Sequence, residues 1–163
     1  LYAWREHGLG VNAPDPAISL QIISVPGEGH FHLAAKARDL GDGSWRYEYA
    51  LFNLNSHQSA RSFKLVLPAG ISVTNVGFDD VDYHSGEIFL GSDWSTVVDA
   101  ESITWSTQTF DENAEANALR YGTQYNFWFD ADAAPAEGLG EIALFRPGDP
   151  ASVGFATRVP GTP

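Results

Sequence analysis

Eight short segments rich in aromatic and β-branched residues most constrain what this chain can fold into. Each is bounded by Gly, Pro, Asn, Asp or Ser, which is typical of strands joined by turns. The segments are 18–24, 30–38, 45–53, 62–68, 71–78, 102–110, 123–131 and 140–146. In "WRYEYALFN" the side chains alternate, so every second residue from Trp45 to Leu51 lies on one face. The pattern predicts an all-β fold, an antiparallel two-sheet sandwich of about eight strands.

The rest of the chain sets the predicted domain organisation. Residues 1–17 are expected to form an irregular N-terminal arm, 18–158 a single β-sandwich domain, and 159–163 a C-terminal tail. One domain is the usual number for a chain of 163 residues. Helix is expected only in short turns, chiefly in 111–122, where an Asp can cap the first turn and a Gly can end the last one.

The charge of the chain excludes two classes of partner. Asp and Glu number 21 against 9 Lys and Arg, which gives a formal net charge of −12. Such a field repels nucleic-acid phosphates and anionic lipid surfaces. The sequence also has no apolar run near the roughly 20 residues that a membrane-spanning helix needs. We therefore expect no nucleic-acid partner and no membrane insertion.

Cys and Met are both absent from the sequence. This removes disulfides, thiolate metal ligands and Cys nucleophiles from consideration. A missing initiator Met indicates that the chain begins after processing, and a removed secretory signal peptide fits best. Together with the acidic, Lys-poor composition, this predicts an extracellular or cell-surface location in a bacterium.

Several motifs resemble known bacterial proteins. "WRYEYALFNLNS" followed by "SFKLVLPAGISVTN" is similar to the immunoglobulin-like modules of bacterial surface proteins. The combination of "VGFDDVDYHSGE", "ITWST" and "NALRYGTQYNFWFDAD" resembles a set of uncharacterised secreted proteins from planctomycete-type bacteria, over roughly 45–146. The resemblance implies an immunoglobulin-like sandwich and a secreted protein. It implies no catalytic residues.

The stretch "DDVDYHSGE" at 79–87 is the strongest candidate site in the sequence. Carboxylates and nearby carbonyls are the ligands that Ca²⁺ prefers. The candidate calcium ligands are Asp79, Asp80, Asp82 and Glu87. The spacing does not match an EF-hand loop, and the alternative is a polar turn closed by Asp side chains. Hydrolysis by His84 and Ser85 is disfavoured, because no nucleophile elbow is present.

Two further residue patterns suggest ligands. His30 and His32 alternate in "HFH" and so share a strand face, where a third ligand from His7, His57 or His84 would complete a transition-metal site. Solvent-facing histidines without a metal are the alternative. The five Trp residues offer stacking platforms for sugar rings. Most of them should be core, and Trp128 is the one expected at a less buried surface.

Three classes of function remain open. The leading expectation is a non-catalytic extracellular module for assembly or adhesion, such as a subunit of a surface layer or filament. Its arm would contact other protein subunits, in a homo-oligomer or filament, through Leu1, Tyr2, Trp4, Leu9 and Val11. The arm packing on its own domain is the alternative. The second class is a carbohydrate- or ligand-binding module that uses exposed Trp, and the third is a small metal-dependent enzyme that uses the histidines and the Asp cluster.

Overall fold

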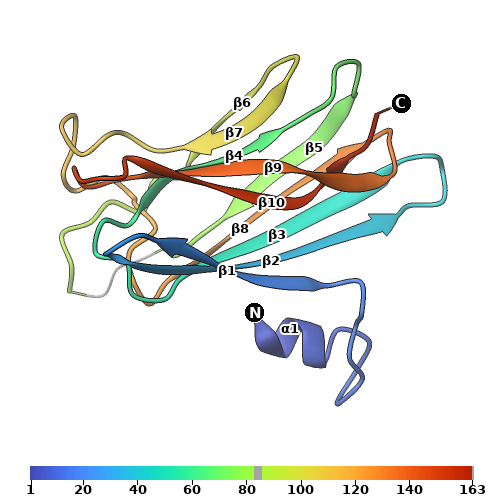
Figure 1. The fold of residues 1–163 in the computed structure, drawn as a ribbon, viewed down its shortest axis with the longest axis horizontal. Coiled ribbons are helices and arrows are strands. Elements are labelled where there is room, and N and C mark those ends of the chain that lie inside the picture. The colour runs from blue at the N-terminus through green and yellow to red at the C-terminus, as the bar shows by residue number, and fades with distance from the viewer. Residues whose placement is uncertain (83–85, 163) are drawn as a thin grey trace.

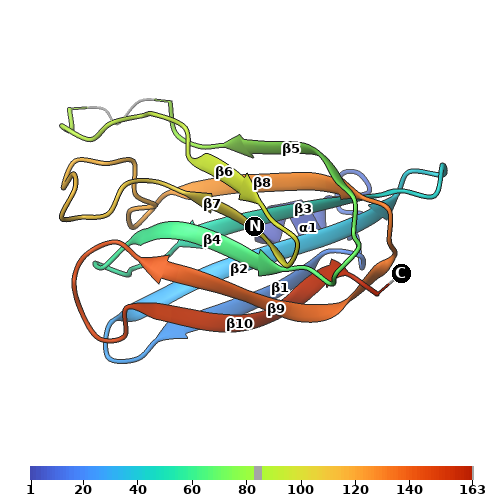
Figure 2. The ribbon, with the colours of Figure 1, turned by 90° about the horizontal axis from the view of Figure 1, so that it is seen from above.

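The chain folds into two antiparallel five-stranded sheets that pack face to face (Figures 1 and 2). The structure is a computed structural model and describes residues 1–82 and 86–162. The first sheet has the order β1-β2-β3-β8-β5 and the second β10-β9-β4-β7-β6. The elements are α1 (Tyr2–Glu6), β1 (Ser19–Val25), β2 (Gly29–Asp39), β3 (Trp45–Asn53), β4 (Ala60–Val66), β5 (Val73–Asp79), β6 (Ser95–Val98), β7 (Ser102–Ser106), β8 (Gln124–Ala131), β9 (Pro135–Leu144) and β10 (Ser152–Pro160). The predicted all-β, antiparallel two-sheet fold is confirmed.

Aromatic side chains from both sheets fill the space between them. The alternation in β3 places Tyr47 and Tyr49 on the inner face, where they are 0% and 2% exposed. The ring of Phe63 on β4 stacks on Phe127 of β8 with a centroid distance of 4.6 Å. Trp105 on β7 is fully buried beside them. Burial of apolar area contributes about 25 cal/mol per Å², so these large rings dominate the stability of the sandwich.

The hydroxyl groups of the two buried tyrosines on β3 each donate a hydrogen bond to a backbone carbonyl. The Tyr47 hydroxyl donates to the carbonyl of Ala133 at 2.7 Å, and that of Tyr49 donates to the carbonyl of Arg158 at 2.6 Å. Burial raises the pKa of both phenols above the ordinary value. A neutral, hydrogen-bonded hydroxyl is the form that an apolar core tolerates.

The helix expected in 111–122 is wrong, because this segment forms turns. Its polar groups bond locally instead of continuing a helical ladder. The Oδ1 atom of Asn113 accepts from the backbone N–H of Glu115 at 3.0 Å, and the Arg120 side chain donates to the carbonyl of Ala116 at 3.1 Å. Asn and Asp side chains compete in this way with helix formation.

The structure also has strands at both ends of the second sheet that the sequence analysis did not predict. These are β6, whose four residues are all exposed, and β10. In β10, Val153, Phe155 and Val159 are buried while exposed small or polar residues lie between them, so a period of two was present in the sequence. Because β10 runs to Pro160, the predicted tail boundary at 159 falls inside this strand.

The N-terminal arm is partly helical and lies against the outer face of the first sheet (Figure 1). Leu1 and Trp4 pack with Ile18, Ala34 and Ala50 in a small apolar cluster on that face. The arm therefore has a place on its own domain, and the expectation that it is irregular throughout is wrong for residues 2–6.

A buried ion pair fixes the end of the arm to the sheet. The Oδ2 atom of Asp15 lies 2.7 Å from Nζ of Lys36 on β2, with the side chains 5% and 18% exposed. The backbone N–H of Asp15 donates to the carbonyl of Arg5 at 2.7 Å. Lys36 and the backbone N–H of Ala17 hold the pKa of Asp15 below its ordinary value. The arm is thus tied to β2 by charge as well as by apolar contact.

Candidate ligand groove

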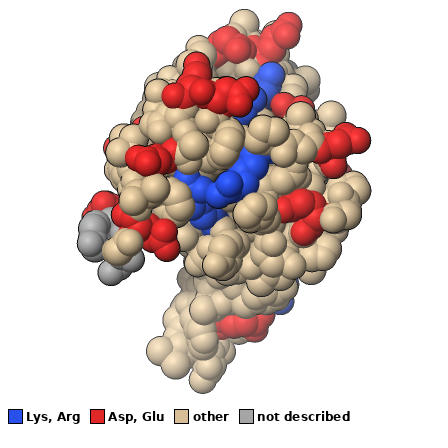
Figure 3. All heavy atoms as spheres, turned by 90° about the vertical axis from the view of Figure 1, so that its left-hand side faces the viewer, with Lys and Arg blue, Asp and Glu red and all other residues tan. Residues whose placement is uncertain are grey.

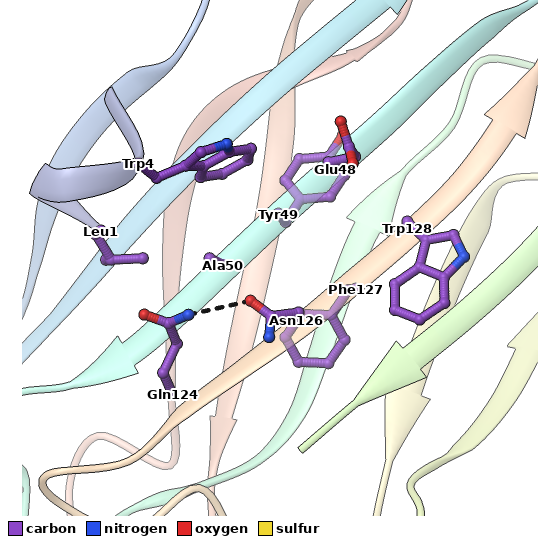
Figure 4. Close-up of a pocket in the computed structure, with 9 residues that line it drawn as sticks. All are labelled: Leu1, Trp4, Glu48, Tyr49, Ala50, Gln124, Asn126, Phe127 and Trp128. Atoms are coloured by element: carbon purple, nitrogen blue, oxygen red, sulfur yellow. Dashed lines mark hydrogen bonds between the residues drawn. The ribbon is translucent and has the colours of Figure 1, made fainter. Parts of the chain in front are cut away.

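A groove of about 290 Å³ lies on the outer face of the first sheet, between α1 and β8 (Figure 4). Paired residues of β3 and β8 form part of its floor and walls. Glu48 on β3 is paired with Trp128 on β8, and Ala50 is paired with Asn126. We call this depression the ligand groove. The residues that line it include Trp4, Glu48, Ala50, Gln124, Asn126 and Trp128.

The indole of Trp128 rests on a glycine of the neighbouring strand. Gly77 on β5 is its pairing partner, and a Cβ atom there would lie 2.0 Å from Cε2 of the Trp128 ring. The pairing of β5 with β8 shifts register between Thr74 and Gly77. Only a residue without a side chain leaves room for the ring in this position. Trp128 is half-buried, as the sequence analysis expected of it.

Trp4 closes the opposite side of the groove and comes from a different part of the chain. Figure 4 shows its ring above Ala50, with Trp128 across the groove. The arm that carries Trp4 is tightly packed, because a Cβ atom at Gly8 would lie 2.7 Å from the Trp4 carbonyl oxygen and 2.6 Å from Cβ of Asp15. Two half-buried indoles therefore border one depression, next to the apolar cluster of the arm.

Amide and carboxylate groups line the groove between the two rings. The side-chain amide of Gln124 donates to Oδ1 of Asn126 at 3.1 Å, and Asn126 donates to Oδ2 of Asp79 at 3.4 Å. Glu48 extends from β3 between the two indoles, nearer to Trp128 than to these amides (Figure 4). Aromatic faces with a few placed polar groups are the usual lining of a site for a small neutral ligand. A sugar ring presents C–H groups to an indole face and hydroxyls to amides and carboxylates.

Asp80, one of the four predicted calcium ligands, accepts a hydrogen bond within the fold. It accepts from the side-chain amide of Asn117, which is itself fully buried. The Oδ1 atom of Asn117 accepts from the Tyr125 hydroxyl at 2.5 Å, and its carbonyl accepts from Nε1 of Trp94 at 2.5 Å. Burial raises the pKa of the Asp80 carboxyl above its ordinary value, although the Asn117 bond opposes this. Asp80 thus ties the β5–β6 connection to the β7–β8 connection.

The other predicted calcium ligands are spread around this position. Asp79 accepts from Asn126, while Asp82 and Glu87 are exposed. Within 1–82 and 86–162, no group of three or more His, Asp or Glu side chains is arranged to hold a metal ion. His84 and Ser85 lie outside the described residues. Calcium binding by this loop stays a prediction.

The two histidines of "HFH" share the outer face of the first sheet. The Nδ1 atom of His30 lies 3.1 Å from Oγ of Ser24. The His32 ring lies edge-on to Tyr2 of the arm and to Phe52, with centroid distances of 6.1 and 6.2 Å. Burial, and then the charge of His30, lower the pKa of His32. The described residues place no third ligand with this pair.

The predicted partner residues of the arm divide into two groups. Leu1 and Trp4 are half-buried on their own domain. Tyr2, Leu9 and Val11 are 54%, 67% and 89% exposed. Contact of these residues with another subunit stays a prediction.

Sequence analysis expected one ring of the groove, Trp128, at a less buried surface, and assigned Trp4 to the arm as a partner contact. Trp94 and Trp105 are core residues, whereas Trp4 and Trp128 line the groove. The alternation of β8 already placed Asn126 on the face of Trp128, and it extends to Gln124. The pairing of β3 with β8, which brings Glu48 into the groove, required the structure.

Comparisons with known proteins give no further lead. The chain matches no family model, no curated protein and no solved structure. In the described part of the chain, no helix is both long enough and apolar enough to cross a bilayer.

Proposed function

We propose that this protein is a non-catalytic, extracellular carbohydrate-binding module that holds a sugar ring in the ligand groove. The observation that carries the proposal is the position of two half-buried indoles, Trp4 and Trp128, on either side of a groove lined by Gln124, Asn126 and Glu48. An indole left half-exposed on a folded surface costs hydrophobic free energy, which a stacked ligand recovers.

The proposed scaffold is an immunoglobulin-like sandwich. Two antiparallel sheets pack over an aromatic core, and the chain passes from one sheet to the other after β3, β4, β5, β7 and β8. Repeated crossing between two sheets is a property of Greek-key sandwiches. The Cys-free, acidic sequence supports the proposed extracellular location.

The carboxylates near the groove support binding more than glycoside hydrolysis, which needs two acids on either side of the scissile bond. Glu48 is the one carboxylate among the described residues that line the groove. Asp130, on the same face, is held by Arg46 and accepts from the side chain of Asn75 at 2.9 Å. Arg46 keeps the pKa of Asp130 below its ordinary value, so this group is poorly suited to act as a general acid.

The size of the groove sets the expected affinity. A volume of about 290 Å³ fits one sugar ring more closely than a long chain. A hexose has about 12 non-hydrogen atoms, and about 0.3 kcal/mol per atom gives a Kd of roughly 1 mM. Longer oligosaccharides should bind more tightly only where they also contact the strands on either side of the groove.

The proposal is tested by titrating the protein with soluble gluco-, xylo-, manno- and chito-oligosaccharides and recording Trp fluorescence and heat. We expect at least one series to bind, and Trp128→Ala to weaken that binding by roughly 5- to 150-fold. Tyr121→Ala is the matched control, because Tyr121 is an aromatic residue 70% exposed outside the groove. Equal binding by wild type and Trp128→Ala would contradict the proposal.

A second candidate is the assembly or adhesion role expected from the sequence. It is favoured by Leu9 and Val11, which remain 67% and 89% exposed in a folded arm, and by β6, an edge strand with four exposed residues. Light scattering at several concentrations, with Ca²⁺ and with EDTA, tests it together with the acidic loop. If the protein assembles through the arm, wild type should form large species and the double variant Leu9→Ser, Val11→Ser should be a monomer. If calcium bridges the subunits, EDTA should also convert the large species to monomers.

A further inference from the structure

The end of the sandwich that faces the viewer in Figure 3 carries a cluster of positive charge. Lys and Arg side chains cross the middle of this end, with Asp and Glu around them. Arg61 follows the β3–β4 connection, Arg120 belongs to the β7–β8 connection and Arg146 to the β9–β10 connection. Three of the nine Lys and Arg of a chain with net charge −12 therefore meet in one region.

Arg120 occupies the interior of this cluster. It is 8% exposed and its guanidinium carbon lies 3.4 Å from the centre of the Phe89 ring and 5.3 Å from that of Phe145. Its Nη2 atom donates to the carbonyls of Ala114 and Ala116 at 3.3 and 3.1 Å. These contacts hold the side chain through aromatic rings and carbonyl oxygens, and Glu87 acts on its charge from beyond ion-pair distance. Within the described residues, no carboxylate lies at ion-pair distance from Arg120.

Arg61 and Arg146 line an open pocket of about 300 Å³ next to Arg120. We call it the arginine pocket. The residues that line it include Arg61, Phe110, Leu144, Arg146 and Gly148. The guanidinium carbon of Arg146 lies 5.5 Å from the centre of the Phe110 ring. Its Nε atom is buried, and the described residues offer it no acceptor.

The walls of the arginine pocket are fixed by backbone bonds. Arg146 donates its N–H to the carbonyl of Gln58 at 2.9 Å, and Phe145 donates to the carbonyl of Ser59 at 3.1 Å. The Phe110 ring packs edge-on against Phe145 with a centroid distance of 5.4 Å. The two arginines are therefore presented by β4 and by an ordered connection, which reduces the ordering cost of binding.

The nearby acids bond elsewhere, although the charge of Arg61 contributes to the lowered pKa of Glu112. The Glu112 carboxylate accepts from the backbone N–H and the hydroxyl of Thr109, both at 2.8 Å. Asp111 is exposed at the pocket edge. Among the described residues, neither forms an ion pair with Arg61 or Arg146. Two guanidinium groups thus face a space that has an aromatic and aliphatic wall.

We propose that the arginine pocket binds the carboxylate of a small organic acid, with the body of the acid against Phe110. Guanidinium groups match the planar, two-oxygen geometry of a carboxylate. The volume of about 300 Å³ suits a ligand the size of benzoate or a hexuronic acid, not a polymer segment. This inference is independent of the sugar groove, since the two sites share no lining residue.

The test compares acids with neutral molecules of the same shape. Uniformly ¹⁵N-labelled protein is titrated with benzoate and with benzamide, and with glucuronate and with glucose, while the backbone amide signals of Phe110 and Arg146 are followed. We expect at least one acid to bind at least 10-fold more tightly than its neutral counterpart. Equal shifts from each acid and its neutral counterpart, or no shifts at all, would overturn the proposal.

Charge variants locate the site. Arg61→Gln should weaken binding of the acid at least 10-fold, whereas Arg158→Gln, which removes the same charge from an exposed position on β10, should leave it unchanged. Asp111→Asn should strengthen binding, because it removes a repelling carboxylate. Equal losses in Arg61→Gln and Arg158→Gln would show a general charge effect and overturn the assignment to this pocket.

Discussion

The ligand groove and the arginine pocket are built in different ways, although both are shallow sites on the same sandwich. The groove takes its polar residues from adjacent positions on β3 and β8, whose pairing fixes their spacing. The arginine pocket takes Arg61 from the start of β4, Phe110 from the β7–β8 connection and Arg146 from the β9–β10 connection. A site on paired strands is partly visible in the period of the sequence, whereas a site made by connections is visible only after folding.

The two sites also differ in the interaction that each offers. The groove presents two indoles and neutral amides, so stacking should dominate there. The pocket presents guanidinium groups with no carboxylate partner among the described residues, so charge should dominate. Each variant below is expected to affect one site and spare the other.

The largest effect should come from Trp128→Ala. Stacking on an aromatic ring contributes about 1–3 kcal/mol by analogy with nucleobases, so sugar affinity should fall by roughly 5- to 150-fold. Benzoate binding at the arginine pocket should be unchanged. Calorimetric titration of the variant with both ligands measures this, and a parallel loss of both would show that the variant perturbs the whole sandwich.

A smaller loss is expected from Gly77→Val, which changes none of the residues that line the groove. Its Cβ atom would lie 2.0 Å from the Trp128 ring, so the indole must move and sugar affinity should fall about 10-fold. Gly154→Ala is the control, because the nearest atom to its Cβ would be 3.8 Å away. Unchanged sugar binding in Gly77→Val would show that the position of Trp128 does not matter.

Asp15→Asn should loosen the arm that carries Trp4. Loss of the ion pair with Lys36 should cost about 2 kcal/mol of unfolding free energy at pH 7 and weaken sugar binding a few-fold. Because the folded pKa of Asp15 is lowered, its stabilisation is full above the ordinary pKa of about 3.9 and is lost as pH falls through the folded value.

Urea unfolding at a series of pH values checks this sign. The difference in unfolding free energy between wild type and Asp15→Asn should be constant near neutral pH and shrink below about pH 4. A difference that grows with acidity would mean that the ion pair does not stabilise the arm.

The smallest effect concerns ionic strength. Raising NaCl from 0.05 to 0.5 M should weaken acid binding at the arginine pocket by about 2- to 5-fold, because salt screens exposed charges. Sugar binding in the groove should stay the same within error. Calorimetry of both ligands at the two salt concentrations makes the comparison, and salt-sensitive sugar binding would contradict the neutral character assigned to the groove.

Much of the fold could be predicted because it follows from local patterns. The alternation of β3 and the aromatic period of β8 indicated half-buried strands, and both are strands over nearly the predicted residues. The turn residues of "GDG" at 41–43 close the β2–β3 hairpin, with Gly41 and Gly43 at positive φ. The prediction of a helix in 111–122 was wrong because side chains bond to the backbone of this segment. The Arg120 guanidinium, for example, donates to the carbonyl of Ala116 within the same connection.

The candidate site was less predictable for a geometric reason. Trp128 was expected at a surface, but Trp4 reaches the groove because the arm folds back on the sheet, through its apolar cluster and the ion pair of Asp15 with Lys36. Nothing in the local sequence of residues 1–17 specifies that contact. Arg61 and Arg146 are separated by more than half of the chain, so no spacing rule could bring them together.

The most direct test of the ligand groove is the indole N–H region of a ¹⁵N–¹H spectrum, recorded with and without saturating oligosaccharide from the series that binds. We predict that the indole signals of Trp4 and Trp128 move while those of Trp94 and Trp105, which are 3% and 0% exposed, stay in place. Signals that do not move for any oligosaccharide series, or shifts confined to the buried indoles, would contradict a sugar site in this groove.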